Sequence, residues 1–387
     1  MIITKFIVKN VFRHKLRTAL TILGLAIAVM AFGLLRTVVT AWNYGVDASS
    51  STRLITRHAV SFIFPLPYNY RDQIAQIPGV KQVSFATWFG GVYKDNAPDA
   101  FFPRFAVDPE SFFPVYNEFI LPDDQLKAFI SQRNGCVVGK KIADQFGFKI
   151  GDIITMQGDI FPGMWDFVVT GIYSGRDKTV DETQMIIQWA YLDESLKETS
   201  PSRVGYVGWY IVAIDKANQA GMVSESIDGL FSNSSAKTKT ETEKAFQQGF
   251  VSMSSAILAS LEIISFVIIG IILLVLGNTM IMSARERIRE YAVLKALGFS
   301  SALVSGLIIG ESVLIGFAGG LIGLALTFPI ANAFGQAFPT IFPVFEVMPV
   351  TMILSVGFSL GVGLLASAFP AWKSGRTTIV DGLRQIE

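Results

Sequence analysis

The chain has 387 residues, of which 51% are apolar and 16% charged, and its mean hydropathy is +0.46. A soluble globular protein carries about a quarter charged residues, so this composition excludes an ordinary soluble domain and is typical of a membrane protein. The net charge of +1 gives no sign of a nucleic-acid partner.

Four apolar runs each reach the roughly 20 residues that a helix needs to cross the hydrocarbon core of a bilayer. We expect membrane-spanning helices over residues 18–42, 256–282, 301–328 and 350–370. Residues 1–17, before the first run, are predicted to form a basic amphipathic helix on the cytoplasmic membrane surface. The first run is too long for a cleavable signal peptide, so we expect it to remain as a span.

Basic residues collect on three of the segments that flank these runs. Residues 1–17, 283–300 and 371–387 carry 12 Lys or Arg against four Asp or Glu, whereas residues 43–255 carry 19 against 24. This bias predicts a multi-pass protein of the bacterial cytoplasmic (inner) membrane, with both termini and residues 283–300 in the cytoplasm. Residues 43–255 and the loop 329–349 are then extracytoplasmic. The basic excess indicates the lipid bilayer as a partner, and not nucleic acid.

The large extracytoplasmic segment, residues 43–255, alternates strand-like and helix-like stretches. This pattern predicts an α+β domain inserted between the first and second membrane helices. We expect one α+β subdomain made from residues 57–107 and 205–245, with a second, β-rich subdomain of about residues 108–204 inserted between them.

Within this domain, Ala59–Phe64 and Val80–Trp88 have the composition of strands, and Tyr70–Ile77 between them is predicted to be a short helix. The only cysteine, Cys136, allows no intramolecular disulfide. The domain is therefore expected to depend on an apolar core.

Residues 283–299, between the second and third spans, combine basic and apolar side chains at helical spacing. The topology rule explains the cations but not the apolar residues among them. A helix with both faces at a membrane surface is expected to dock a soluble partner. The basic residues are Arg285, Arg287, Arg289 and Lys295, and the apolar residues are Ile288, Tyr291, Leu294 and Leu297.

The sequence of this segment resembles the signature that precedes the third membrane helix in MacB/FtsX/LolC-type ABC transporter permeases. Residues 283–298 read Ser-Ala-Arg-Glu-Arg-Ile-Arg-Glu-Tyr-Ala-Val-Leu-Lys-Ala-Leu-Gly. The opening Asn10–Gly24 and the tail Phe369–Arg384 resemble the same family, with Ile379 where the family often has Pro. Gly139–Asp152 is similar to a short sequence motif in the family's external domain. The resemblance thus spans both membrane halves and parts of the middle of the chain.

The resemblance implies a MacB-like permease subunit without a fused ATPase domain, whose first α+β subdomain is the porter-like part. It implies two copies of this chain, each contacting a separate cytoplasmic ABC ATPase subunit. The external domains would then move like a lever when ATP binds and is hydrolysed (mechanotransmission), for export or extraction of a substrate. A periplasmic adaptor, or membrane fusion protein, is the further partner that the resemblance implies. ATP and Mg would be bound by the ATPase, and no cofactor by this chain.

On the same resemblance, we expect the ATPase to dock on the charged segment. Replacing Leu294 by Asp is then expected to abolish association with the ATPase without loss of membrane insertion. The expected docking residues are Arg285, Glu286, Arg287, Glu290, Tyr291, Leu294, Lys295 and Gly298.

No part of the sequence suggests catalysis. The segment nearest to a phosphate-binding loop, Gly135–Lys141, has the wrong spacing and no Ser or Thr after the lysine. The two histidines, His14 and His58, lie in different segments and cannot form a His-rich metal site together. We therefore expect a non-catalytic membrane subunit without a metal.

Three charged residues lie in or near the apolar runs, where ionised groups are costly. Arg36 and Glu262 lie at similar depth near the outer interface, where they either pair or reach separately into water. Glu311 lies about 15 Å along the third span, close to mid-membrane. For Glu311 we favour a buried carboxylate bonded to a neighbouring helix over a proton or substrate contact.

Small residues recur at four-residue spacing in the third and fourth spans. Such spacing lets helices approach closely, so these residues are expected to serve packing within the subunit or the dimer. They are Gly316, Gly319, Gly320, Gly323, Gly357 and Gly361.

Two other classes of function stay open. An FtsX-like regulator uses the same motor to activate a cell-wall hydrolase, although its external domain is generally smaller than the one expected here. A membrane anchor or receptor without a motor would not need the charged segment. No residue identifies the substrate.

Overall fold

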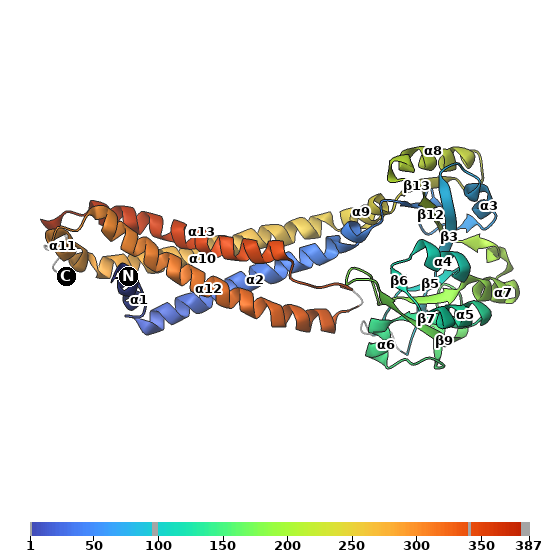
Figure 1. Cartoon of the computed structure of the whole chain (residues 1–387), viewed down its shortest axis with the longest axis horizontal. Helices are drawn as coiled ribbons and strands as arrows, with labels where there is room; N and C mark the ends of the chain where they lie inside the picture. The colour runs from blue at the N-terminus through green and yellow to red at the C-terminus, as the bar shows by residue number, and fades with distance from the viewer. Residues whose placement is uncertain (1, 95–99, 340–341, 381–387) are drawn as a thin grey trace. The chain divides into compact units, whose positions relative to one another are not determined.

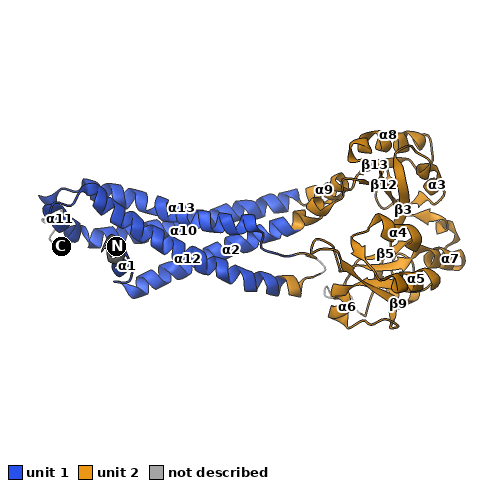
Figure 2. Cartoon of the chain, viewed as in Figure 1, with its two compact units in different colours: residues 1–41, 255–334, 345–387 blue, residues 42–254, 335–344 orange. Residues whose placement is uncertain are grey.

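The computed structural model describes residues 2–94, 100–339 and 342–380, with side-chain positions from residue 7 onward. The chain forms two compact units, shown in different colours in Figure 2. The helical unit comprises residues 1–41, 255–334 and 345–387, and the α+β unit comprises residues 42–254 and 335–344. Residues 381–387 of the predicted cytoplasmic tail lie outside the described part of the chain.

The helical unit contains four long helices, α2, α10, α12 and α13. Within the described residues, these four are long and apolar enough to cross a membrane. They have 28 to 37 residues, or roughly 42 to 56 Å at ~1.5 Å per residue, and so exceed a hydrocarbon core of about 30 Å. Their bounds are α2 Lys15–Ala48, α10 Ser255–Glu286, α12 Ser301–Ala337 and α13 Pro349–Arg376. The predicted membrane fold, with an α+β insertion between the first two spans, is confirmed.

Two short helices, α1 Ile2–Val11 and α11 Ile288–Ala296, lie at the same end of the helical unit (Figure 1). We name this the connector end, defined by α1, residues 285–300 and the last turn of α13. It is the part of the described chain in which the segments with the predicted family signature meet.

Glycines allow α12 to approach its neighbours closely. A Cβ added at Gly316 would lie 2.7 Å from the carbonyl oxygen of Ser359 on α13, and one at Gly323 would lie 2.5 Å from that of Ala26 on α2. Gly319 and Gly320 are equally crowded. By contrast, a Cβ at Gly357 or Gly361 would meet no heavy atom of the described residues within 4 Å, beyond its own helix and chain neighbours. The packing predicted for these last two glycines is therefore absent within the described subunit.

The α+β unit is built on one large sheet whose strand order is β13-β1-β12-β3-β5-β10-β7-β9-β8-β4, with β6 paired to β9. Most pairs are antiparallel, but β5 pairs with β10, and β7 with β9, in parallel. The main strands are β1 Arg53–His58, β3 Val80–Trp88, β5 Arg104–Val107, β7 Gly135–Gly139, β8 Ile153–Gly158, β9 Gly163–Gly175, β10 Met185–Gln188, β12 Trp209–Ile214 and β13 Thr238–Thr242. The shortest strands are β2 Leu66–Pro67, β4 Gly91–Val92, β6 Phe119–Ile120 and β11 Tyr206–Val207, and β2 and β11 form a separate pair.

Both faces of this sheet are covered by short helices. The helices are α3 Tyr70–Ala75, α4 Pro109–Val115, α5 Asp123–Ser131, α6 Lys140–Phe146, α7 Trp189–Thr199, α8 Ala220–Leu230 and α9 Glu243–Met253. α3 and α8 pack on the β1–β12–β3 part, while α4 and α5 cover the opposite face. Cys136 is buried in the core, and burial raises the pKa of its thiol well above the usual range.

The strand predicted over Ala59–Phe64 is wrong, because β1 ends at His58 and residues 59–64 form bends and turns. The actual strand begins at Arg53, a residue type that is rarely buried without a partner. Its charge is neutralised by two glutamates that are distant in sequence, so no local pattern revealed the strand. Val80–Trp88 coincides with β3, as predicted, and α3 lies within the helix predicted over Tyr70–Ile77.

Candidate functional site

The connector end is built around an elbow between α10 and α11. Helix α10 ends at Glu286, Arg287 leaves the helical conformation, and α11 begins at Ile288. α11 ends in a glycine-dependent cap, in which Gly298 has φ +90°. The Gly298 N–H donates to the carbonyl of Lys295, and the Phe299 N–H donates to that of Leu294. Gly298, predicted as a docking residue, therefore has a backbone role, since other residues rarely adopt this conformation.

Arg287 lies inside the helical unit and holds the elbow to two other elements. Only 4% of this residue is exposed. Its guanidinium donates to Glu311 on α12 at 2.8 Å and to the carbonyl of Asn10 on α1 at 2.9 Å. A residue with these contacts is not available to an incoming partner. Glu311 is thus bonded to another element of the helical unit.

Further ion pairs connect the N-terminal helices to the elbow. Arg17 on α2 forms two hydrogen bonds with Glu286, at 2.7 and 2.8 Å. Arg13, between α1 and α2, pairs with Glu290 on α11. A small cavity lies beside these contacts, and its lining includes Thr18, Ser283 and Glu311. The hydroxyl residues of this cavity were not identified from the sequence.

Three more predicted docking residues have intramolecular contacts. Tyr291 is 6% exposed, and burial raises the pKa of its hydroxyl to about 12. Leu294 packs against the apolar core of the helical unit. The Nζ of Lys295 donates to the carbonyls of Ser374, Gly375 and Thr377, at 3.1, 2.8 and 2.8 Å. A cation at this position stabilises the C-terminal end of α13, where carbonyl groups lack helical partners.

The other side of α11 is exposed and apolar. Val293, Leu297 and Phe299 are 48%, 71% and 44% exposed, and we name these three residues the α11 outer face. Val293 and Leu297 are one helical turn apart, and Phe299 follows the glycine cap. Arg285 is also exposed. Sequence reasoning included Leu297 in the apolar face but did not select it for docking, whereas it did select the buried Arg287 and Tyr291.

The remaining intramembrane charges pair across α2 and α10. Arg36 donates to Glu262 at 2.9 Å, which resolves the two alternatives left by the sequence in favour of a pair. The pairs Arg17–Glu286 and Arg36–Glu262 are 19 residues apart on α2, or roughly 28 Å, and 24 residues apart on α10, or roughly 36 Å, at ~1.5 Å per residue. The two separations lie on either side of the thickness of a hydrocarbon core, about 30 Å.

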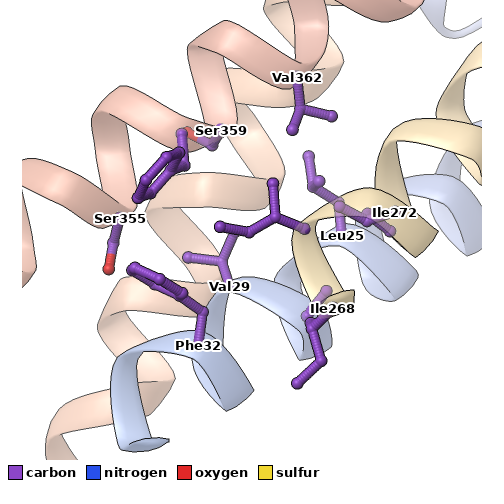
Figure 3. Close-up of a pocket in the computed structure, with 11 residues that line it drawn as sticks. Leu25, Val29, Phe32, Ile268, Ile272, Ser355, Ser359 and Val362 are labelled. Carbon is purple, nitrogen blue, oxygen red and sulfur yellow. The ribbon is translucent and has the colours of Figure 1, made fainter. Parts of the chain in front are cut away.

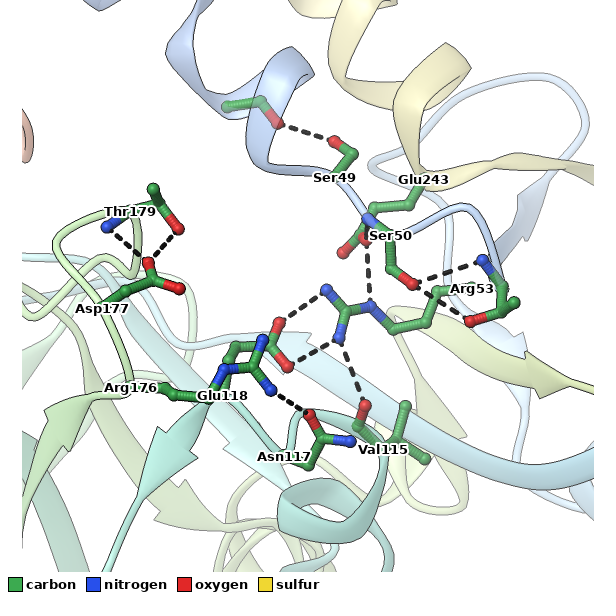
Figure 4. Close-up of polar contacts among 12 residues, drawn as sticks. Ser49, Ser50, Arg53, Val115, Asn117, Glu118, Arg176, Asp177, Thr179 and Glu243 are labelled. Carbon is green, nitrogen blue, oxygen red and sulfur yellow. Dashed lines mark hydrogen bonds and ion pairs between the residues drawn. The ribbon is translucent and has the colours of Figure 1, made fainter.

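A second buried arginine, Arg53 in the α+β unit, was missed from the sequence (Figure 4). It pairs with Glu118 at 2.6 Å and with Glu243 at 2.9 Å, and it lies over the ring of Tyr116 at 4.2 Å. Glu243, the first residue of α9, also accepts the backbone N–H of Ser50 at 2.7 Å. One charge cluster therefore joins the chain that follows α2, the start of α9 and the end of α4.

The chain has relatives among ABC transporter permeases. It is 23% identical to an uncharacterized ABC transporter permease of Methanocaldococcus jannaschii, over 99% of this chain and 97% of that protein. It is 30% identical over 129 residues to the macrolide export ATP-binding/permease protein MacB of Neisseria gonorrhoeae, covering 33% of this chain and 19% of that protein. It is 27% identical over 132 residues to the ABC transporter permease YtrF of Bacillus subtilis, covering 30% of each.

Two solved domains are also similar. The extracellular domain of the transporter YknZ from Gram-positive bacteria matches 49% of this chain and 98% of that domain, with 15% identity and a TM-score of 0.36. The periplasmic region of MacB from Actinobacillus actinomycetemcomitans matches 53% of this chain and 95% of that region, with 11% identity and a TM-score of 0.37.

Two family descriptions match the chain in the order of its parts. Residues 18–230 match the MacB-like periplasmic core domain, and residues 262–379 match the FtsX-like permease C-terminal region. The second match contains the elbow, α11 and Glu311, and the first contains Arg53 and the strands from β1 to β12. Among the described residues, no group of His, Cys, Asp and Glu could hold a metal ion. With the first match alone covering more than half of the sequence, the chain belongs to the MacB/FtsX family of ABC transporter permeases.

Proposed function

We propose that this permease subunit couples ATP hydrolysis by a separate ATPase to a conformational change of its α+β unit, for export or extraction of a substrate. In this proposal the connector end faces the cytoplasm of a bacterial inner membrane, in accordance with its excess of Lys and Arg. Two copies of the chain work together, and a periplasmic adaptor receives the substrate. ATP and Mg are bound by the ATPase.

The observation that carries the proposal is the two-sided character of α11. Its inner side is held by Arg287, Tyr291 and Lys295 to α1, α12 and the end of α13. Its outer face presents apolar side chains that have no reason to be exposed at a membrane surface unless they are covered by a partner or by lipid headgroups. A force applied to the outer face would therefore be passed directly to the spans.

The contacts also revise which residues should bind the ATPase. Leu294 packs inside the helical unit, so Leu294→Asp would disturb the position of α11 as well as any binding surface. We assign docking to Val293, Leu297 and Phe299, together with the exposed Arg285. We assign positioning of the helix to Arg287, Tyr291, Lys295 and Gly298. Glu286 and Glu290 are assigned to the ion pairs with Arg17 and Arg13.

Co-purification of the tagged full-length chain from its native membrane in mild detergent tests the proposal. We expect an ATPase with nucleotide-binding motifs to be recovered with the unaltered chain and to fall at least about tenfold with Leu297→Asp, since a buried hot-spot residue contributes more than 1.4 kcal/mol. Leu230→Asp is the matched control, because Leu230 is a 50% exposed leucine on α8, in the other unit.

Recovery of equal amounts of ATPase with both variants would contradict docking on the α11 outer face. Absence of any ATPase, under conditions that preserve other membrane complexes, would contradict the proposal that this chain is coupled to a separate ATPase. An adaptor in the same preparation would support export, whereas a cell-wall hydrolase would support the regulatory alternative.

A further inference from the structure

The chain that leads into α13, residues 342–348, belongs in part to each unit. Residues 342–344 are part of the α+β unit although they lie between two spans in the sequence, whereas Phe345 is part of the helical unit. Val344 and Phe345 are 9% and 7% exposed. A connecting loop normally runs over the surface, so the burial of these side chains indicates that the chain is held at this place.

A lysine holds this chain in the α+β unit. The Nζ of Lys141, the second residue of α6, donates a hydrogen bond to the carbonyl of Pro343. The first turn of α6 contains no acidic residue, and the positive end of the helix dipole repels a lysine there. The contact with Pro343 gives the ammonium group an acceptor that offsets this repulsion. Next to it, the ring of Phe342 lies 5.9 Å from that of Trp42 on α2.

The same chain is held in the helical unit by Phe345, whose ring lies 4.9 Å from that of Phe334 on α12. The close contacts at Gly316 and Gly323 pack α12 against α13 and α2. α13 also packs against α2 and α10, around a narrow apolar pocket (Figure 3). The four spans therefore form one packed bundle, in which a displacement of one span is passed to the others.

These two attachments are very close in the chain. Pro343 and Phe345 are two residues apart, and an extended chain spans at most ~3.6 Å per residue. Their Cα atoms can therefore be no more than about 7 Å apart. When the bundle moves Phe345, either the part of the α+β unit that holds Pro343 follows, or the bond from Lys141 breaks.

We propose that residues 342–345 form a tether that makes α6 follow the C-terminal end of α12, with the bond from Lys141 as its releasable attachment. α6 packs on β7 and β9, towards one end of the sheet, whereas the Arg53 cluster holds β1 near the other end. The tether thus gives the β7–β9 part of the sheet its own connection to the spans. It does not depend on ATPase docking, which concerns the connector end.

Amide hydrogen exchange of the full-length chain in detergent tests the tether without any partner protein. Lys141→Met removes the donor but keeps a long apolar side chain. We expect the exchange of residues 342–345 to increase at least about tenfold, because a hydrogen bond from a charged donor is lost. Lys141→Arg, which keeps a charged donor, should exchange like the unaltered chain.

The matched control is Lys140→Met, because Lys140 is the exposed neighbour of Lys141 in the same turn of α6. Both lysine-to-methionine variants remove a cation from the start of the helix, but the contact with Pro343 is made by Lys141. An equal increase in both variants, or none in Lys141→Met, would overturn the proposal. Exchange in Lys141→Arg as fast as in Lys141→Met would overturn it as well.

Spin labels test whether α6 follows α12. One label is placed at Asp144→Cys on α6 and the other at Gln336→Cys on α12, two positions that are exposed. Cys136 is buried, so it stays unlabelled. We expect a narrow distribution of distances between the labels, which becomes broad with Lys141→Met and stays narrow with Lys140→Met. A broad distribution with both lysines intact, or a narrow one with Lys141→Met, would overturn the proposal.

Discussion

Arg287 of the helical unit and Arg53 of the α+β unit are both almost fully buried, but their charges are neutralised differently. Arg287 has one carboxylate, Glu311, and the backbone carbonyl of Asn10. Arg53 has two carboxylates, Glu118 and Glu243, together with the carbonyl of Val115 and the ring of Tyr116. Buried charges are tolerated only with such partners.

The difference indicates how each arginine responds to the loss of a partner. Arg53 keeps a carboxylate when either glutamate is removed, whereas Arg287 keeps none when Glu311 is removed. In the Arg53 cluster, either glutamate can therefore neutralise the arginine when the other is lost. The Arg287 pair is a single link at the place where we propose that force enters the protein.

The largest effect is expected from removing Arg53, because two buried carboxylates would then repel each other. Arg53→Ala should lower the free energy of unfolding of the α+β unit by about 3–5 kcal/mol, the cost of breaking a buried ion pair. Urea unfolding of the full-length protein, followed by the fluorescence of the tryptophans, measures this change. Arg57→Ala, on the same strand and with a less buried pair to Glu241, should cost under about 1 kcal/mol. Equal effects would contradict the role given to burial.

The next effect tests the redundancy directly. Glu311→Gln should lower the free energy of unfolding of the helical unit by about 3 kcal/mol, because Arg287 would lose its only carboxylate among the described residues. Glu118→Gln should cost the α+β unit about 1 kcal/mol, the value of one hydrogen bond, because Glu243 remains. The shift in the midpoint of detergent or urea unfolding measures both. A larger loss for Glu118→Gln would reverse the comparison.

A smaller and more local effect is expected at Lys295. Lys295→Met should destabilise the end of α13 by about 2 kcal/mol, since charged donors to carbonyls contribute about 1.5–3 kcal/mol. Amide hydrogen exchange of residues 373–377 should then increase about thirtyfold, which corresponds to that free energy. Lys373→Met, which removes an exposed lysine from the same turn, is the control. Unchanged exchange in Lys295→Met would show that the carbonyl contacts do not hold this end.

The smallest effect is expected from the exposed pair Arg13–Glu290. Arg13→Gln should change the free energy of unfolding by under about 0.5 kcal/mol, because both side chains are about half exposed and solvent screens their attraction. Thermal unfolding at low and high salt measures the change, and the difference from the unaltered protein should vanish at high salt. If Arg13→Gln lowered the free energy of unfolding as much as Glu311→Gln, the exposed pair Arg13–Glu290 would be the main contact that holds the elbow.

Much of the membrane architecture could be predicted from the sequence. Apolar runs of about 20 residues have few alternatives to a spanning helix, because backbone groups in lipid must be satisfied within the segment. Strand β3 and helix α3 were predictable for a similar reason, since their local composition agrees with their final conformation. The family resemblance depended on a contiguous sequence motif around Arg287, and the match to the family description confirms the resemblance.

The orientation of α11 could not be predicted, because both of its sides carry apolar and basic residues. Arg287 and Tyr291 face inward only since Glu311, on another helix, accepts the guanidinium. The same holds for strand β1, whose buried Arg53 depends on Glu118 and Glu243, distant in the chain. Local sequence patterns were enough for the spanning helices, for β3 and for α3, but not for β1. Only tertiary contacts determined which charged residues are buried, because a charge leaves water at low cost only where the fold supplies hydrogen-bond acceptors or an opposite charge.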